Sequence, residues 1–174
     1  LPAPDVKSFI AFLKTHPDAV SYGSTGSGAA NHLAMELLQS MAGVKLVHVP
    51  YKGSGAALAD AINGRVPALF VNLSPASTHV KTGKLRALAV TALKRSLLMP
   101  QVPTLDESGL AGYDLVNWFG FLVPAGTPDD VVRRLNGAIV KIVESADYRA
   151  RISALGAEPL SSTPEQMRPF LSAE

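Results

Sequence analysis

Short apolar runs alternate with longer helix-like segments through residues 5 to 91, and this alternation constrains the fold more than any other feature of the chain. Apolar residues that recur at helical spacing, each set ended by Gly or Pro, predict helices over 4–16, 27–42 and 54–63. Strands are expected at 19–22, 46–49, 66–71 and 85–91. This order favours an α/β fold, with a mostly parallel sheet and helices on both of its faces.

The rest of the chain is richer in loops and helices. Further helices are expected to begin at Ser74-Pro75, at Thr127-Pro128 and at Thr163, where Thr163 and Gln166 have the spacing of a capping box. The other expectations are a helical turn at 104–108, an extended run at 114–123, a helix at 147–155 and a last strand residue at Leu160.

Composition excludes several classes of protein. Of the 174 residues, 47% are hydrophobic and 17% are charged, which suits a chain with a real core and excludes a disordered one. The net charge of +2 is spread without a basic stripe, so nothing indicates nucleic acid. Cysteine is absent, which excludes disulfides, zinc fingers and thiol catalysis. The four histidines lack the spacing of metal ligands, and the apolar runs are too short to cross a bilayer.

A loop rich in glycine and hydroxyl groups joins the first strand to the next helix. Ser24, Thr25, Gly26 and Ser27 form its centre. Unpaired N–H groups and the positive end of a helix dipole favour an anion there, such as a carboxylate or a phosphate. The order of the glycines is neither that of a dinucleotide-binding loop nor that of a P-loop, so the spacing alone fits an ordinary strand-to-helix turn equally well.

Two more loops follow the carboxyl ends of predicted parallel strands and should meet the first loop at one rim of the sheet. Tyr51 and Lys52 can donate hydrogen bonds to an acid, although a solvated lysine is the better interpretation of Lys52. Asn72 can recognise a ligand or tie down its own loop, and the character of its neighbours favours the ligand.

Signs of catalysis are weak. The chain has no G-x-S-x-G turn, and no nucleophile or metal is paired with a histidine. His32 is expected to stabilise the loop, and His48 to be a satisfied core residue, while Trp118 can line a pocket or pack in a core. The alternatives to a binding protein are an α/β enzyme acting on a small carboxylate or phosphate ester, with His32 or His48 as base, and a stand-alone sensor domain.

Several segments, taken together and in their order along the chain, resemble one family. They are Tyr22 to Gly28 with His32-Leu33, Gly43-Val44 through His48 to Gly53, Gly83 to Thr91, Pro103-Thr104, Trp118 to Gly120, Pro124 to Pro128 and Leu155 to Pro159. The chain is similar to the Bug-type periplasmic solute receptors of tripartite tricarboxylate transporters. This resemblance implies the type II periplasmic-binding-protein fold, a periplasmic location, a small carboxylate ligand, delivery to integral-membrane permease subunits, and neither cofactor nor metal nor reaction.

Members of that family carry a strand and a Pro-Gly-rich loop ahead of the point where this sequence begins. The resemblance therefore implies that residues 1–118 form the second, ligand-binding lobe, and that 119–174 form a return strand and the C-terminal helices of an incomplete first lobe. The acid would dock against Ser24, Thr25, Gly26 and Ser27, with Asn72 adding an amide and Tyr51 lining the site. Open apolar surface also predicts self-association of this chain, or weak or absent ligand binding by it.

Overall fold

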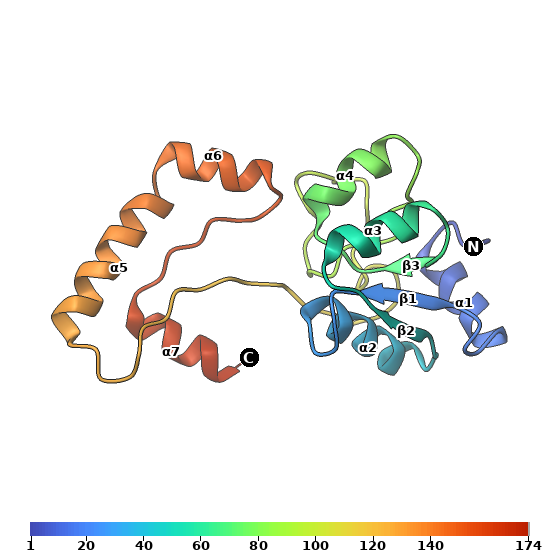
Figure 1. Cartoon of the computed structure of the whole chain (residues 1–174), viewed down its shortest axis with the longest axis horizontal. Helices are drawn as coiled ribbons and strands as arrows, with labels where there is room; N and C mark the ends of the chain where they lie inside the picture. The colour runs from blue at the N-terminus through green and yellow to red at the C-terminus, as the bar shows by residue number, and fades with distance from the viewer. Residues whose placement is uncertain (174) are drawn as a thin grey trace. The chain divides into compact units, whose positions relative to one another are not determined.

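The computed structural model describes residues 1–173, which divide into two compact units, one of them Leu1–Asn117 and the other beginning at Trp118 (Figure 1). The first unit contains α1 (Val6–Thr15), β1 (Ser21–Ser24), α2 (Ala30–Ala42), β2 (Val47–Pro50), α3 (Ser54–Ile62), β3 (Ala68–Leu69) and α4 (Leu73–Lys81). The second contains α5 (Asp129–Val143), α6 (Ala146–Ala154) and α7 (Pro164–Ala173). Within residues 1–173, no helix is both long and apolar enough to span a membrane.

The sheet of the first unit has three parallel strands in the order β2-β1-β3. Strand β1 is central, and its last residue, Ser24, lies opposite Pro50 at the end of β2. On the other side Gly23 lies opposite Leu69 of β3. The carboxyl ends of the three strands therefore meet at one edge, and the predicted α/β fold with a parallel sheet is confirmed.

Consecutive residues of β1 show that helices cover both faces of the sheet, because side chains alternate between faces along a strand. Tyr22 is fully buried on the face covered by α2, where its hydroxyl donates to Glu36 over 2.7 Å. Gly23 points to the other face, where a Cβ atom would lie 3.5 Å from Ala57 of α3. A Cβ atom at position 23 would thus be in ordinary van der Waals contact with α3.

The main core lies on the α1 and α2 side of the sheet. Helix α1 buries Val6, Phe9 and Leu13, which are spaced along one face. The segment after α4 returns to this core: Leu105, Leu110 and Tyr113 belong to the same buried cluster as residues of α1 and α2. The Tyr113 hydroxyl donates to the Ala34 carbonyl over 2.7 Å, and burial raises the pKa of this phenol.

The predicted helical turn at 104–108 is confirmed, and so is the capping box of α7. Glu107 accepts from the Thr104 N–H, and Thr104 Oγ1 accepts in return from the Glu107 N–H, both over 3.0 Å. At α7 the same exchange joins Thr163 and Gln166. These reciprocal bonds satisfy backbone donors that a helix start would otherwise leave unpaired.

The strand predictions were wrong in several places. The run 66–71 forms only the two-residue β3, and 85–91 forms no strand, since Val90 makes a single isolated bridge to Thr104. Among the described residues no strand is present in 119–173, where a return strand was expected within 119–174 and a last strand residue at Leu160. Helix α4 begins at Leu73, so Asn72 and not Ser74 occupies its cap position.

Candidate functional site

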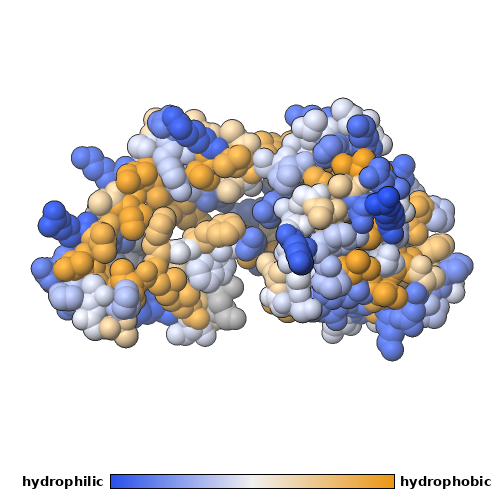
Figure 2. Space-filling view, in the orientation of Figure 1, coloured by the Kyte–Doolittle hydropathy of each residue, from blue (hydrophilic) through white to orange (hydrophobic). Residues whose placement is uncertain are grey.

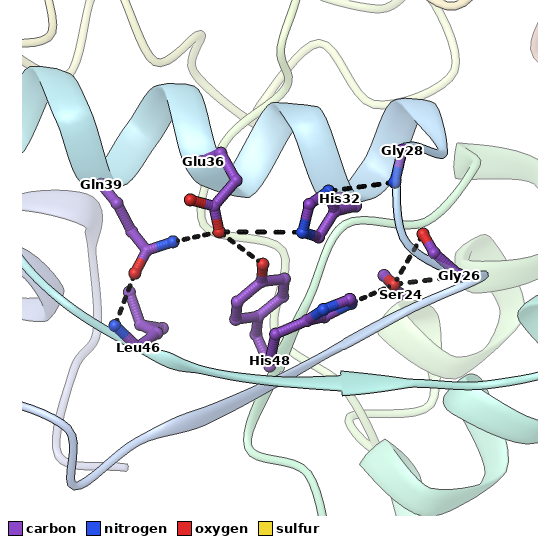
Figure 3. Close-up of polar contacts among 9 residues, drawn as sticks. Ser24, Gly26, Gly28, His32, Glu36, Gln39, Leu46 and His48 are labelled. Carbon is purple, nitrogen blue, oxygen red and sulfur yellow. Dashed lines mark hydrogen bonds and ion pairs between the residues drawn. The ribbon is translucent and has the colours of Figure 1, made fainter.

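The loop from Ser24 to Ala29 leads from the end of β1 into α2 (Figure 3). Gly26 and Gly28 have φ angles of 130° and 79°, which side-chain-bearing residues rarely adopt. The Ala29 N–H donates to the Gly26 carbonyl over 3.2 Å and closes a tight turn. The two glycines and this hydrogen bond thus make a tight turn that ends where α2 begins.

The buried side chain of Ser24 holds this loop through hydrogen bonds. Its side chain is fully buried, its Oγ accepts from the Gly26 N–H over 3.1 Å, and the same Oγ lies 2.5 Å from His48 Nε2 (Figure 3). A serine and a histidine at this distance have the geometry of a nucleophile and its base. Because solvent does not reach Ser24, however, the pair serves to fix the loop to β2.

Two side chains of α2 fold back onto the same loop. Asn31 Oδ1 accepts from the Thr25 N–H over 3.2 Å and from Thr25 Oγ1 over 3.1 Å. His32 Nδ1 accepts from the Gly28 N–H over 3.3 Å (Figure 3). The predicted role of His32 in stabilising the loop is confirmed by this bond. Thr25, Gly26 and Gly28 therefore have internal acceptors for their N–H groups.

Three neighbouring backbone N–H groups are left without an acceptor in the described part of the chain, and these are called open donors below. In the part of the chain that the structure describes, the backbone donors of Ser27, Ala30 and Asn31 have no acceptor, and Ser27 is exposed. They surround the N-terminus of α2, where the helix dipole is positive. A turn with open donors and no adjacent carboxylate can accept an oxygen of an anion.

A stack of rings lies beneath the loop. The ring centroids of Tyr22 and His48 are 4.9 Å apart, and those of His48 and His32 are 4.3 Å apart. Glu36 accepts from the Tyr22 hydroxyl and lies 4.0 Å from His32 Nε2 (Figure 3). Burial, aided by the nearby His32, lowers the pKa of His48, and Glu36 opposes this shift only in part. The imidazole of His48 is thus favoured in its neutral form.

Tyr51 lies at the carboxyl end of β2. Its N–H donates to the Ser24 carbonyl over 2.9 Å, which joins the second loop to the first. Its ring packs over Gly23, and its hydroxyl donates to Asp60 over 2.9 Å, so this hydroxyl is already used. Burial and the Asp60 carboxylate both raise the pKa of Tyr51.

Lys52 and Asn72 are both exposed at the same edge of the sheet. The Asn72 side chain makes no capping bond to α4, although the residue occupies the cap position. Its amide is therefore available to a ligand. Trp118 lies in the second unit, where it packs edge-on against Phe170 with centroids 5.1 Å apart.

The first unit has two surface hollows, and one of them includes Glu36 in its lining. One of about 380 Å³ is lined by Asp18, Glu36, Gln39, Ser40, Val44, Lys45 and Leu46. Another of about 470 Å³ is lined by Pro4, Asp5, Val80, Gly83, Leu85, Arg86, Ala87, Leu88, Gln101, Val102 and Pro103. Neither is lined by a predicted site residue. Within residues 1–173 no group of three or more acidic, His or Cys residues is placed to hold a metal ion.

Sequence reasoning missed the side chains that shape the rim, above all Asn31, Glu36 and Asp60. Asn31 gave one usable signal: asparagine is a poor helix former, and here it lies in the first turn of a helix directly after a glycine-rich loop. Glu36 and Asp60 looked like ordinary solvated residues of helices. Only the tertiary structure shows that each accepts from a tyrosine hydroxyl.

The whole chain, residues 1–174, matches the family described as the tripartite tricarboxylate transporter family receptor. The chain belongs to this family. BugT of Bordetella pertussis is 35% identical over 167 residues, which are 96% of this chain and 51% of BugT. The match extends across both compact units, so the resemblance predicted from the motifs is confirmed.

Solved structures agree with this assignment. R. palustris Rpa4515, whose structure is described as containing adipate, superposes with a TM-score of 0.89 at 34% identity over 99% of this chain and 58% of that one. MatC from Rhodopseudomonas palustris, described with bound malate, superposes with a TM-score of 0.82 at 30% identity over the same shares. Other matches are described as a periplasmic transporter and a periplasmic binding protein.

These findings bear on the alternatives. The chain belongs to a family of non-catalytic binding proteins, which favours the binding interpretation over an enzyme that uses His32 or His48 as base. Relatives bind small carboxylates. The chain spans about half the length of the curated relatives it matches.

Proposed function

We propose that this chain provides the carboxylate-holding rim of a periplasmic solute receptor, and that the N-terminus of α2 binds one carboxylate of a small organic acid. The open N–H groups of Ser27, Ala30 and Asn31 carry this proposal, because the other donors of the loop are paired internally. Adipate and malate in two solved relatives support the choice of ligand class.

The six predicted residues take different parts in this proposal. Ser27 contacts the carboxylate directly, and Asn72 adds its exposed amide from the loop after β3. Ser24, Thr25 and Gly26 set the path of the loop through their internal bonds. Tyr51 contributes its ring as a wall of the rim, since its hydroxyl is held by Asp60.

Two parts of the proposal concern the whole receptor. Residues 1–118 act as its second lobe, and 119–174 supply the C-terminal helices of its first lobe. The loaded receptor delivers its acid from the periplasm to integral-membrane permease subunits. The division into two compact units near residue 118 supports the first statement. The family description and the relatives described as periplasmic support the second.

The first test places a negative charge at the proposed anion site. Ser27→Asp should weaken the binding of adipate and malate by about tenfold or more, because two carboxylates would compete for the same donors. The same change should not lower the melting temperature, since an acid in the loop just ahead of α2 suits the dipole of that helix. Isothermal titration calorimetry of the 174-residue chain measures the affinity.

Ser40→Asp is the matched control, because Ser40 is exposed on the same helix and the change alters the net charge equally. It should leave the affinity within about twofold, since a single exposed charge is screened over such a distance. Equal losses in both variants, or no binding of either acid by the unaltered chain, would refute the proposed site.

A further inference from the structure

Asn31, in the first turn of α2, is the residue that joins two sides of the rim. It is half-buried at the second position of the helix. Its Oδ1 accepts both hydrogen bonds from Thr25, in the loop after β1. Its Nδ2 donates over 3.4 Å to the carbonyl of Phe70, which follows β3 directly and lies 39 residues further along the chain. One side chain therefore connects the loop after β1 to the segment after β3.

Few side chains can make this connection. The loop presents two donors, and the segment after β3 presents an acceptor, so the bridging group must accept at one end and donate at the other. A carboxamide of the length of asparagine does so. A carboxylate would face the Phe70 carbonyl with a second acceptor, and an apolar residue would leave the half-buried donors of Thr25 unpaired.

The hydrogen bonds of Asn31 to Thr25 and to Phe70, called the bridge below, determine which backbone donors of the rim remain accessible to a ligand. Because Asn31 takes both the N–H and the hydroxyl of Thr25, that residue is turned toward α2 and away from a ligand. Ser27, two residues further along the loop, is then left exposed with its N–H open. The bond to Phe70 holds the start of the loop that carries Asn72.

We propose that Asn31 is a positioning residue of the carboxylate site, which fixes the loop after β1 relative to the segment after β3 and so aims the donors at Ser27 and Asn72 toward one ligand. The inference rests on the proposed function for its ligand, but the bridge itself stands on hydrogen bonds within the first unit.

The test combines binding with local protection in the 174-residue chain. Asn31→Ala should weaken the affinity for adipate and malate about tenfold, and the Thr25 amide should exchange its hydrogen about tenfold faster, because it loses its only acceptor. Thr25→Val removes the hydroxyl bond alone and should weaken binding about threefold. The double variant should bind no more weakly than Asn31→Ala, because both changes act on one bridge.

The control is Ser40→Ala, an exposed position on the same helix, which should change neither quantity. Unchanged Thr25 exchange and unchanged affinity in Asn31→Ala, or fully additive losses in the double variant, would overturn the inference. If Asn31→Ala does not fold, the Thr25→Val variant decides: unchanged binding in it counts against the bridge. If the unaltered chain binds neither acid, the proposed function fails for these ligands, and Thr25 exchange alone decides the role of Asn31.

Discussion

At the scale of single residues, the ionisation of His48 is tied to the fold by the groups around it. Four groups surround it: Ser24 at its Nε2, the Tyr22 ring, the His32 ring and the more distant Glu36. Burial and His32 lower its pKa below the ordinary value near 6.5, so the folded chain binds a proton here less readily than the unfolded chain does.

This shift predicts a loss of stability in mild acid. The contribution of neutral His48 is fully present above pH of about 6.5 and is lost as the pH falls toward the lowered folded-state pKa, because the unfolded state then binds the extra proton. His48→Gln keeps an amide near Ser24 but cannot titrate. It should cost about 1 kcal/mol at a pH of about 8 and should reduce the further loss between about pH 7 and pH 5.

Urea unfolding at a series of pH values measures both effects. Ser40→Ala serves as the control and should retain the pH dependence of the unaltered chain, since Ser40 is exposed and lies outside the stack. The account of His48 would be wrong if His48→Gln and the unaltered chain lost stability in parallel over this pH range.

The site was predictable in part at this scale. The glycines and hydroxyls marked the loop from Ser24 to Ser27, and the order of strands and helices indicated the edge of the sheet to which it belongs. The hydrogen bonds that divide this loop into paired and open donors depend on Asn31 and His32, which fold back from α2. Spacing along a sequence does not reveal which side chain returns to which amide.

At the scale of elements, helices were predicted better than strands. A helix makes its hydrogen bonds within one segment, so apolar spacing and end signals suffice to predict it, as for α1, which was predicted over 4–16 and spans Val6–Thr15. A strand needs a neighbour. The apolar runs 66–71 and 85–91 look alike in sequence, yet only Ala68 and Leu69 pair with β1.

Two glycines of the first unit, Gly43 at the end of α2 and Gly55 within α3, predict opposite changes in stability on substitution by alanine. Gly43 ends α2 with φ 63° and ψ 44°, a left-handed conformation that costs a residue with a Cβ atom about 1 kcal/mol. No atom lies within 4 Å of a Cβ placed there, so the cost is purely conformational. We expect Gly43→Ala to lower the free energy of unfolding by about 1 kcal/mol, measured by urea denaturation.

Gly55 of α3 is the matched control. A methyl group added at this position would also meet open space, but the φ of Gly55 is not positive and the residue lies inside a helix. Gly55→Ala should raise stability by about 0.5 kcal/mol, because alanine loses less backbone entropy than glycine on folding. The same sign of change in both variants would contradict the conformational explanation for Gly43.

At the scale of the whole molecule, burial differs sharply between the two units. Among the described residues, the buried apolar side chains lie in the first unit with the single exception of Val143 in α5. In the second unit Phe119 and Phe121 are 87% and 79% exposed. Figure 2 shows apolar surface over the helices of this unit, including α5 and α6. Little hydrophobic free energy therefore holds α5, α6 and α7.

Local stability should follow this distribution, because segments with few buried apolar contacts open most readily. In native-state hydrogen exchange, amides of α5 to α7 should exchange about a hundredfold faster than those of α1 and α2. Equal protection in both units would refute this expectation.

The same measurement also tests self-association. If a second copy covers the exposed apolar side chains, the protection of α5 must rise with protein concentration while that of α1 stays constant. If protection of α5 is low at every protein concentration, a second copy of the chain does not cover these side chains.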